Sequence, residues 1–212
     1  MAFGAAKASA LRHNPSLPTG PNHPYAPRMK RLALLAAALG CAAFQPAPPT
    51  AQDVFFARLQ ALCGQSFQGR LASPVTPADA AFAGPMTVQV RDCTPSQVRM
   101  PLAVGEDRSR TWVVTRTAEG LTLKHDHRHA DGTEDALSQY GGSTAAPGRA
   151  DRQDFPVDAF SRELFLRLNA PASVANTWAL EVQPGARMAY ELNRPGRHFR
   201  VEFDLTTPAA TR

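Results

Sequence analysis

The chain of 212 residues contains only three cysteines, and it lacks the motifs that identify the common enzyme classes. The cysteines form no CxxC pair and show no Cys/His spacing, which argues against a structural zinc site. There is no glycine-rich phosphate loop, no dinucleotide-binding fingerprint and no Gly-x-Ser-x-Gly elbow. We therefore do not expect a P-loop nucleotidase, a nucleotide-dependent dehydrogenase or a serine hydrolase.

The excess of positive charge is confined to the N-terminal quarter of the chain. The whole chain has 23 basic and 18 acidic side chains, a formal net charge of +5. All 18 acidic residues lie at or beyond Asp53, and five of the 23 basic residues precede it, which leaves 18 of each sign in residues 52–212. A domain without net charge gives no support to nucleic-acid binding, so no nucleic-acid partner is expected.

The N-terminal part has the features of a leader for export. Residues 1–28 are rich in Pro, Ala, Asn and His and show no apolar period. We expect either a mis-assigned upstream extension, with translation beginning at Met29, or a disordered N-terminal tail. Residues 29–43 combine Lys30-Arg31 with a short apolar run, which is typical of a signal peptide and too short for a membrane span. We expect an exported bacterial protein, either periplasmic or attached to a membrane.

Two ways of processing this leader remain open. The segment Ala38-Leu39-Gly40-Cys41 resembles a bacterial lipobox, in which Cys41 would be lipidated and residues 44–51 would form a Pro/Ala tether. In that case the lipid on Cys41 is the only membrane contact that we expect. Alternatively, Cys41-Ala42-Ala43 offers the small residues that an ordinary signal peptidase requires.

The two other cysteines, Cys63 and Cys93, form an even pair in a chain that is expected to reach an oxidising compartment. This predicts a disulfide that joins the end of a first helix to the end of a strand. Two buried free thiols are the alternative.

Residues 52–208 are expected to form a single β-domain. Apolar and polar residues alternate in successive short segments, which predicts antiparallel strands with one dry face. The clearest segments are residues 86–90, 98–104, 112–114, 121–123, 178–182, 188–192 and 199–205. A short helix is predicted to start at Thr50-Ala51-Gln52-Asp53, where Asp53 takes the capping-box position, and to stop at Gly64. A second helix is predicted near 158–168 with Asp158 as its N-cap.

Short turns between consecutive strands decide the architecture. Turn dipeptides occur at Glu119-Gly120, Asp131-Gly132, Pro184-Gly185 and Pro195-Gly196. Strands joined in this way favour an up-and-down barrel, whose closure removes exposed edges. We predict a mainly β fold, an antiparallel up-and-down barrel of about eight to ten strands with an N-terminal helix and one further helix.

The segment from Leu62 to Gly69, with Gly64 and Phe67, is similar to the opening of calycin barrels, the lipocalin and fatty-acid-binding-protein group. There a short helix precedes a Gly-x-aromatic motif at the first strand; here the aromatic lies one residue further on. The wider text, including Arg108–Trp112 and Arg197–Phe203, resembles a group of uncharacterised exported bacterial proteins. The resemblance implies a calycin-like barrel and brings no activity with it.

Three histidines, His125, His127 and His129, occur on one predicted strand with a spacing that directs them to one face. If Asp131-Gly132 closes a two-residue hairpin, His129 is paired with Glu134, and His127 with a small residue, Ala136. Neighbouring histidines on this face are about 6.6 Å apart along the strand, so the outer two cannot share one metal ion.

The predicted pairing therefore makes His127, His129 and Glu134 the candidate metal site, suited to a divalent Zn, Fe or Mn ion. The spacing resembles the first cupin motif, in which His-x-His is followed by Glu and then by Gly, here Gly141. Gly120 lies one residue too far upstream for that motif, and Pro195–His198 is only a contracted form of the second one. A cupin-like, metal-dependent enzyme is thus one hypothesis.

The alternative to a metal site is a polar rim, in which each imidazole is bonded to a nearby carboxylate or to water. Our leading hypothesis is a non-catalytic protein that binds a small, partly apolar ligand. The candidate ligand-binding residues are His125, His127, His129, Tyr140, Trp112 and Trp178. An envelope structural or interaction protein with a filled barrel is the third hypothesis. The charged segment 105–110 is interpreted either as an anion clamp or as a solvated hairpin end.

Overall fold

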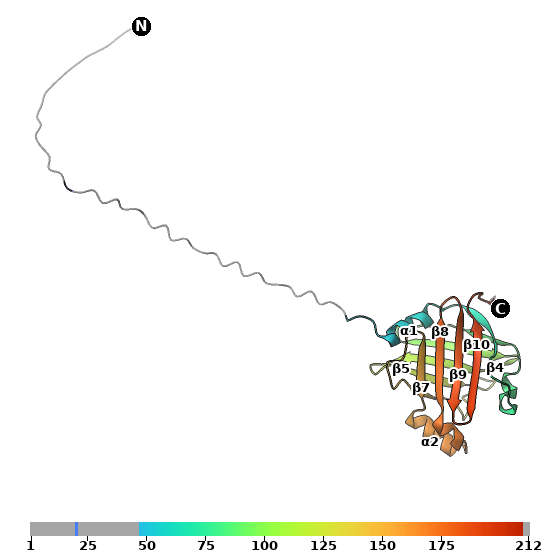
Figure 1. Ribbon diagram of the computed structural model, residues 1–212. Helices are drawn as coiled ribbons and strands as arrows, with labels where there is room; N and C mark the ends of the chain where they lie inside the picture. Colours follow the sequence, from blue (N-terminus) through green and yellow to red (C-terminus); the bar gives the residue numbers. More distant parts are fainter. Residues whose placement is uncertain (1–19, 21–46, 210–212) are drawn as a thin grey trace, which may run out of the picture. The chain divides into compact units, whose positions relative to one another are not determined.

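The computed structural model describes residue 20 and residues 47–209 (Figure 1). The predicted signal segment 29–43, with Cys41, lies outside the described residues. The helices are α1 (Ala51–Gln60), η1 (Pro77–Phe82), α2 (Ala159–Arg167) and η2 (Pro171–Ala175), where η denotes a 3-10 helix. The strands are β1 (Ser66–Leu71), β2 (Met86–Gln89), β3 (Gln97–Val104), β4 (Asp107–Arg116), β5 (Leu121–His127), β6 (Tyr140–Ser143), β7 (Arg152–Pro156), β8 (Thr177–Gln183), β9 (Arg187–Arg194) and β10 (Arg197–Asp204).

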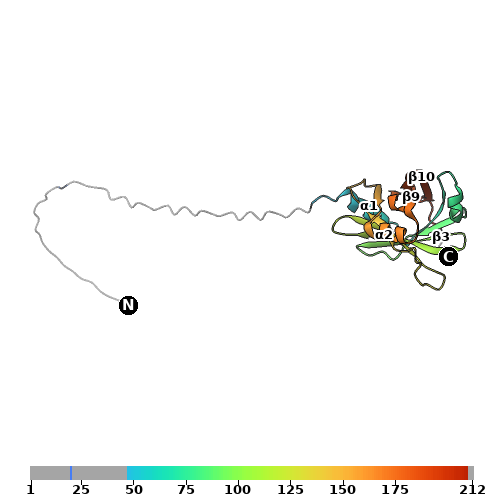
Figure 2. The same cartoon turned by 90° about the horizontal axis from the view of Figure 1, so that it is seen from below.

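The ten strands form one antiparallel sheet that curls into a nearly closed up-and-down barrel (Figures 1 and 2). The strand order is β6-β5-β4-β3-β2-β1-β10-β9-β8-β7. The two edge strands, β6 and β7, therefore meet where the barrel closes, and we call this place the seam. A single bridge between Gly142 and Val157 joins the two sides there. The predicted fold class is confirmed, including the N-terminal helix and the helix near 158–168.

The N-terminal helix α1 begins where a capping box predicts. The Thr50 hydroxyl accepts a hydrogen bond from the Asp53 amide at 3.1 Å, and the Asp53 carboxylate accepts one from the Thr50 amide at 2.8 Å. The helix buries Phe55, Phe56 and Leu59 in the barrel core and contacts β7 and β8. We call the barrel end that it covers the α1 end. Within the described residues, no helix is long and apolar enough to cross a membrane.

The predicted disulfide is confirmed. Cys63 and Cys93 are bonded, and they connect the segment after α1 to the segment after β2. The bond closes a loop of 30 residues at the α1 end of the barrel. Because a cross-link of this length restricts the unfolded chain, it stabilises the domain by about 3.6 kcal/mol in the chain-entropy description.

The interior of the barrel is filled by side chains from every strand. The alternation seen in the sequence is reproduced as burial, and the inward-facing residues form one continuous hydrophobic core with α1. Its largest fully buried members are Trp178, Phe55, Phe56, Phe67, Phe155, Phe203, Leu59, Met86, Met100, Leu102, Leu121 and Leu123. Burial of this set against water is the main stabilising term of the domain.

Two adjacent glycines on β6 allow close approach of the backbones on both sides, β7 across the seam and β5 within the sheet. A Cβ atom on Gly142 would lie 2.0 Å from the carbonyl oxygen of Pro156, and one on Gly141 would lie 1.8 Å from that of Leu123. The neighbouring backbones therefore approach more closely than any other residue type permits. The α2 helix follows β7 at this seam, where the Ser161 hydroxyl accepts a hydrogen bond from the Gly141 amide.

Candidate functional site at the α2 end of the barrel

The barrel end opposite α1, which we call the α2 end, is formed by connections of several strands (Figure 1). Here β5 ends, β4 begins, and α2 and η2 connect β7 to β8. The helix η1 connects β1 to β2 at the same end. Five of the six predicted ligand-binding residues lie on strands that reach this end, and His129 lies in the loop that follows β5.

A layer of aromatic side chains crosses the barrel interior below the α2 end. We call it the aromatic layer, and its members are Trp112, His125, Tyr140, Trp178 and Tyr190. The His125 ring is stacked on Tyr140 at 4.4 Å between centroids, and Trp112 is stacked on Tyr190 at 4.3 Å. Trp178 lies 5.3 Å from His125 and 5.8 Å from Tyr140. The layer joins strands β4, β5, β6, β8 and β9 across the full width of the barrel.

His125 is a structural member of this layer and is fully paired. Its Nδ1 donates to the carbonyl oxygen of Tyr140 at 3.1 Å, because a carbonyl can only accept. Its Nε2 must then be the unprotonated nitrogen, and it accepts from the Tyr190 hydroxyl at 2.8 Å. Burial lowers the pKa of His125 to about 3, so the ring is neutral at physiological pH.

His127 lies one layer closer to the α2 end and is half-buried. It is the register partner of Arg110 on β4, and its Nε2 is 3.4 Å from the Tyr140 hydroxyl. Burial lowers the pKa of His127, and the nearby Arg110 guanidinium lowers it further. Burial also raises the pKa of the Tyr140 hydroxyl, which therefore stays a proton donor. Arg110 itself lies over the Phe82 ring at 5.1 Å, so cationic, imidazole and phenol groups gather here.

His129 and Glu134 are not brought to this group. The His129 side chain is 57 % exposed, and its nearest carboxylate is that of Asp135 at 3.9 Å. Glu134 is bridged to Arg128 on the outer face instead of to His129. The predicted pairing of His129 with Glu134 is therefore wrong, as is that of His127 with Ala136.

The loop length explains this difference. The His129 amide donates to the carbonyl of Thr133, and Gly132 has a φ of +86°, so the loop has three residues with a glycine in the left-handed region at its end. A loop of two residues was expected. One extra loop residue shifts the register by one, which sends Glu134 to the opposite face.

A second irregularity separates the hairpin from β6. Residues 136–139 interrupt the pairing, and the Ser138 hydroxyl takes the place of a backbone acceptor for the His127 amide at 2.9 Å. Gln139 has a φ of +58°, and its amide donates to the His125 carbonyl. As a result Tyr140 lies opposite His125, whereas a regular continuation of the two-residue hairpin would place Ser138 there.

The donor set of the proposed metal site is thus not assembled. Among the described residues, no group of three His, Cys, Asp or Glu side chains is placed to hold a metal ion. Glu134 instead accepts hydrogen bonds from Gln139 at 2.6 Å and from Ser138 at 3.3 Å. The carboxylate between these donors stabilises the hairpin.

The predicted ligand-binding tryptophans lie within the core. Trp112 is 2 % exposed and Trp178 is fully buried, so neighbouring side chains cover both rings. Two residues of the site, Arg110 and Tyr190, were not among the predicted ligand-binding residues. Arg110 shares the inward alternation of Trp112 and Val114, which was the available signal; the contact of Tyr190 with His125 joins distant strands and had no local signal.

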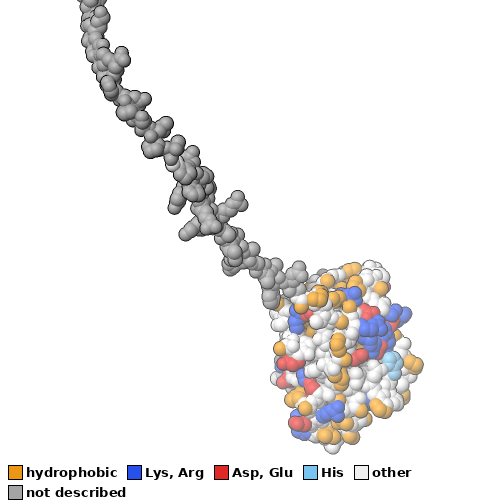
Figure 3. Space-filling model, turned by 60° about the vertical axis from the view of Figure 1, so that its left-hand side comes forward, with side chains coloured by type: hydrophobic (Ala, Val, Ile, Leu, Met, Phe, Trp, Pro, Cys, Tyr) orange, Lys and Arg blue, Asp and Glu red, His pale blue; other side chains and the backbone are white. Residues whose placement is uncertain are grey.

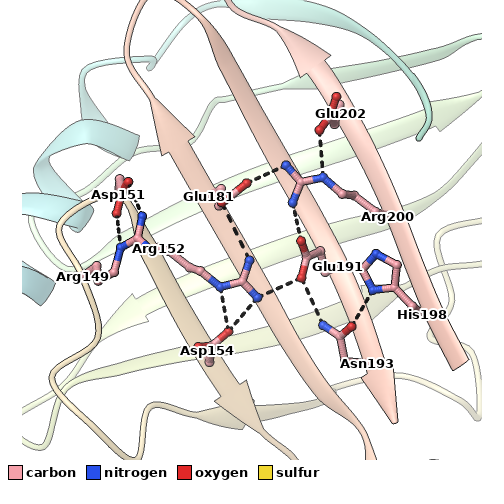
Figure 4. A network of polar contacts seen from close by, with 10 residues as sticks. All are labelled: Arg149, Asp151, Arg152, Asp154, Glu181, Glu191, Asn193, His198, Arg200 and Glu202. Atoms are coloured by element: carbon pink, nitrogen blue, oxygen red, sulfur yellow. Dashed lines mark hydrogen bonds and ion pairs between the residues drawn. The ribbon is translucent and has the colours of Figure 1, made fainter. Parts of the chain in front are cut away.

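Outside the barrel, charged side chains on β7 to β10 form a network (Figure 4). Glu191 accepts from Arg152 at 2.8 Å and is also paired with Arg200, which binds Glu181 at 2.6 Å. Burial alone would raise the pKa of Glu191, but hydrogen bonds from Arg152, Asn193 and Arg200 outweigh it and lower the pKa to about 2.

His198 also belongs to the outer face. Its Nδ1 is 2.6 Å from the Asn193 side-chain oxygen, well away from the interior histidines.

In the charged segment 105–110, Arg108 donates to the Gly105 carbonyl and Arg110 is paired with Asp107. On the face shown in Figure 3, acidic and basic side chains lie next to one another, in agreement with the absence of net charge.

Comparisons with known proteins found no family model, no curated protein and no solved structure that matches this chain.

Proposed function

We propose that this chain is an exported, non-catalytic protein that binds a small, partly apolar molecule at the α2 end of its barrel. The ligand would lie above the aromatic layer, since side chains already fill the layer itself. Arg110, His127 and the Tyr140 hydroxyl would bind its polar end, and Phe82 and Leu192 its apolar part. The observation that carries this proposal is the gathering of three polar groups beside these partly buried apolar side chains.

The surface around the α2 end supports the proposal. Large apolar side chains that are exposed in the described part of the chain belong to segments at this end. They are Val75, Leu137, Phe160, Leu166 and Leu168. Apolar side chains around a group of convergent polar ones are the usual composition of a small-molecule site.

The disulfide supports the cellular location that we propose. Disulfides such as Cys63–Cys93 form and persist in oxidising compartments, which agrees with export to the periplasm or the envelope. Attachment of the protein to a membrane through a lipid on Cys41 remains part of the proposal.

The experiment is a fluorescence titration of the purified protein with 1-anilinonaphthalene-8-sulfonate, an apolar probe with one anionic group. We expect saturable binding with one site. His127→Gln should weaken it about tenfold, because a hydrogen bond to a charged group contributes about 1.5–3 kcal/mol. His129→Gln is the matched control, since that histidine is exposed and lies two residues away, in the loop that follows β5. Equal binding by the two variants would contradict the proposal.

A second candidate function is that of an envelope interaction protein with a filled barrel. The observation that favours it is the complete burial of Trp178 and its neighbours. A filled interior leaves only the outer surface to bind a partner protein. If the probe does not bind the wild-type protein, this second function is the one to pursue.

A further inference from the structure

A groove with a volume of about 620 Å³ lies on the outer face of the barrel, over strands β1 to β4. Outward-facing side chains line it, among them Gln68, Thr87, Gln89, Pro101, Ala103 and Thr111. The volume is in the range of small-molecule sites, about 300–1,000 Å³. The groove is separated by the sheet from the inward-facing Arg110, His127 and Tyr140, so an inference about it is independent of the proposed function.

The groove is hollow because the outward-facing residues in its centre are short. Ala103 is paired with Thr87 across β2 and β3, and Pro101 with Thr111 across β3 and β4. Longer side chains stand at its edges, including Gln68, Gln89 and Arg108. The strand pairing thus places a floor of small side chains between polar walls.

The polar side chains of the groove include both hydrogen-bond donors and hydrogen-bond acceptors. The Gln68 carbonyl oxygen accepts from the Thr87 hydroxyl at 3.3 Å, which leaves the Gln68 amide free to donate. Within the part of the chain that is described, no hydrogen-bond partner is found for the Gln89 side chain. Amides and hydroxyls of this kind match a ligand whose own groups both donate and accept, as the hydroxyls of a sugar do.

Other ligand classes fit the groove less well. An anion requires donors only, yet Glu106 lies at one edge and Arg91 is already paired with Asp92 at 3.3 Å. A peptide strand requires free backbone groups to pair with, but β2, β3 and β4 are paired on both sides within the sheet. Pro101 and Ala103 offer flat apolar surface, which suits the C–H face of a sugar ring.

We propose that this groove is a binding site for a neutral oligosaccharide. Gln68, Gln89 and Thr111 bind its hydroxyls, and its rings lie over Pro101 and Ala103. The partner is recognised by side chains alone, from the outside of the barrel.

The test is an amide-resonance titration of the isotope-labelled protein by NMR, with chitotetraose, maltotetraose and cellotetraose as probes. At least one of them is expected to shift the resonances of Thr87, Gln89, Ala103 and Thr111 in a saturable manner. Gln89→Ala should weaken binding about fivefold or more, the effect of losing one buried hydrogen bond. Gln97→Ala is the matched control, because Gln97 lies on β3 outside the groove and donates to Thr115.

A second variant, Ala103→Trp, and two further probes, inorganic phosphate and hexaglutamate, distinguish oligosaccharide binding from the other ligand classes. Ala103→Trp fills the floor of the groove and should abolish the shifts, while unchanged interior resonances report that the variant is folded. The proposal is overturned if no tetrasaccharide shifts the groove residues, or if Ala103→Trp binds as the wild type does. It is also overturned if only inorganic phosphate or hexaglutamate shifts them, since these report an anion site or a peptide site. The probe titration at the α2 end is unaffected by any of these outcomes, so the two proposals fail separately.

Discussion

His125 and Tyr140 are joined in two ways: their rings are stacked at 4.4 Å, and the His125 Nδ1 donates to the Tyr140 backbone carbonyl at 3.1 Å. The same histidine accepts from Tyr190 through its other nitrogen. Every polar atom of the imidazole is thereby used within the protein. Of the three histidines in the run, this one is held as a neutral part of the core.

The neutral state of His125 predicts a loss of stability in mild acid. Its pKa of about 3 in the folded protein lies below the value of about 6.5 expected when unfolded. Below pH 6.5 the unfolded chain binds a proton that the folded chain does not, so the free energy of unfolding falls as the pH is lowered from about 6.5 towards 3, by up to about 1.4 kcal/mol per pH unit. Urea unfolding at pH 7.5, 6.0 and 5.0 measures this slope.

The exposed His129 provides the control for that slope. His129→Gln should retain the decline between pH 6.0 and 5.0, whereas His125→Gln should reduce it and lower the stability at pH 7.5. An equal slope in wild type and His125→Gln would show that another group causes the decline.

The hydroxyl of Tyr190 predicts a clear effect of a single-atom deletion. Tyr190→Phe leaves the buried Nε2 of His125 without a donor, which should reduce the free energy of unfolding by about 1–3 kcal/mol. Tyr140→Phe removes a hydroxyl that is only 3.4 Å from the half-buried His127, and the loss should be smaller. Chemical denaturation of both variants checks this order, and the reverse order would contradict the assigned network.

The closure of the barrel is expected to depend on Gly142. Gly142→Ala places a methyl group against the Pro156 carbonyl oxygen, and neither backbone can move without opening the seam. We expect a loss of at least about 2 kcal/mol in the free energy of unfolding. Gly84→Ala is the control, because its nearest neighbour would be at 3.4 Å, and it should change stability by about 0.5 kcal/mol or less. Similar effects of the two substitutions would argue against a tight seam.

The outer charge network predicts a different pH range for acid destabilisation. The pKa of Glu191, about 2 when folded, is lower than the value of 4.5 expected when unfolded, so its contribution is present above pH 4.5 and is lost as the pH falls towards 2. Glu191→Gln leaves Arg152 and Arg200 without this carboxylate and should reduce stability at pH 7 by about 1.5–3 kcal/mol. Thermal unfolding at several pH values tests this, with Glu163→Gln on the exposed surface of α2 as control. A Glu191→Gln protein as stable as the control would show that the network contributes little.

Much of the fold follows from short-range patterns in the chain. The alternation in β2, β3, β8, β9 and β10 could be interpreted because a strand with one dry face repeats every two residues. The capping box at Thr50 and the N-cap at Asp158 are local hydrogen bonds, and both helices begin where these residues predict. The pairing of Cys63 with Cys93 followed from the count of cysteines and the expected compartment.

The candidate site was harder to predict, because it depends on register. The Asp131-Gly132 pair indicated a turn, but both a two-residue and a three-residue loop accommodate a glycine with positive φ. That one residue decides whether Glu134 faces His129 or Arg128. The interruption at residues 136–139 then determines that Tyr140, and not Ser138, is opposite His125.

The sequence by itself determined the barrel class, the direction of the dry face in the seven strands that alternate clearly, and the neutral balance of charge in residues 52–212, since these depend on composition and on neighbours a few residues apart. Only the tertiary structure decided which groups meet at the α2 end. Arg110 lies opposite His127 through the register of the consecutive strands β4 and β5, whereas Tyr190 reaches His125 from β9, because barrel closure brings together strands that are distant in the chain. The free energy of the contact between Tyr190 and His125 is gained only when the whole sheet has curled, so no local pattern records it.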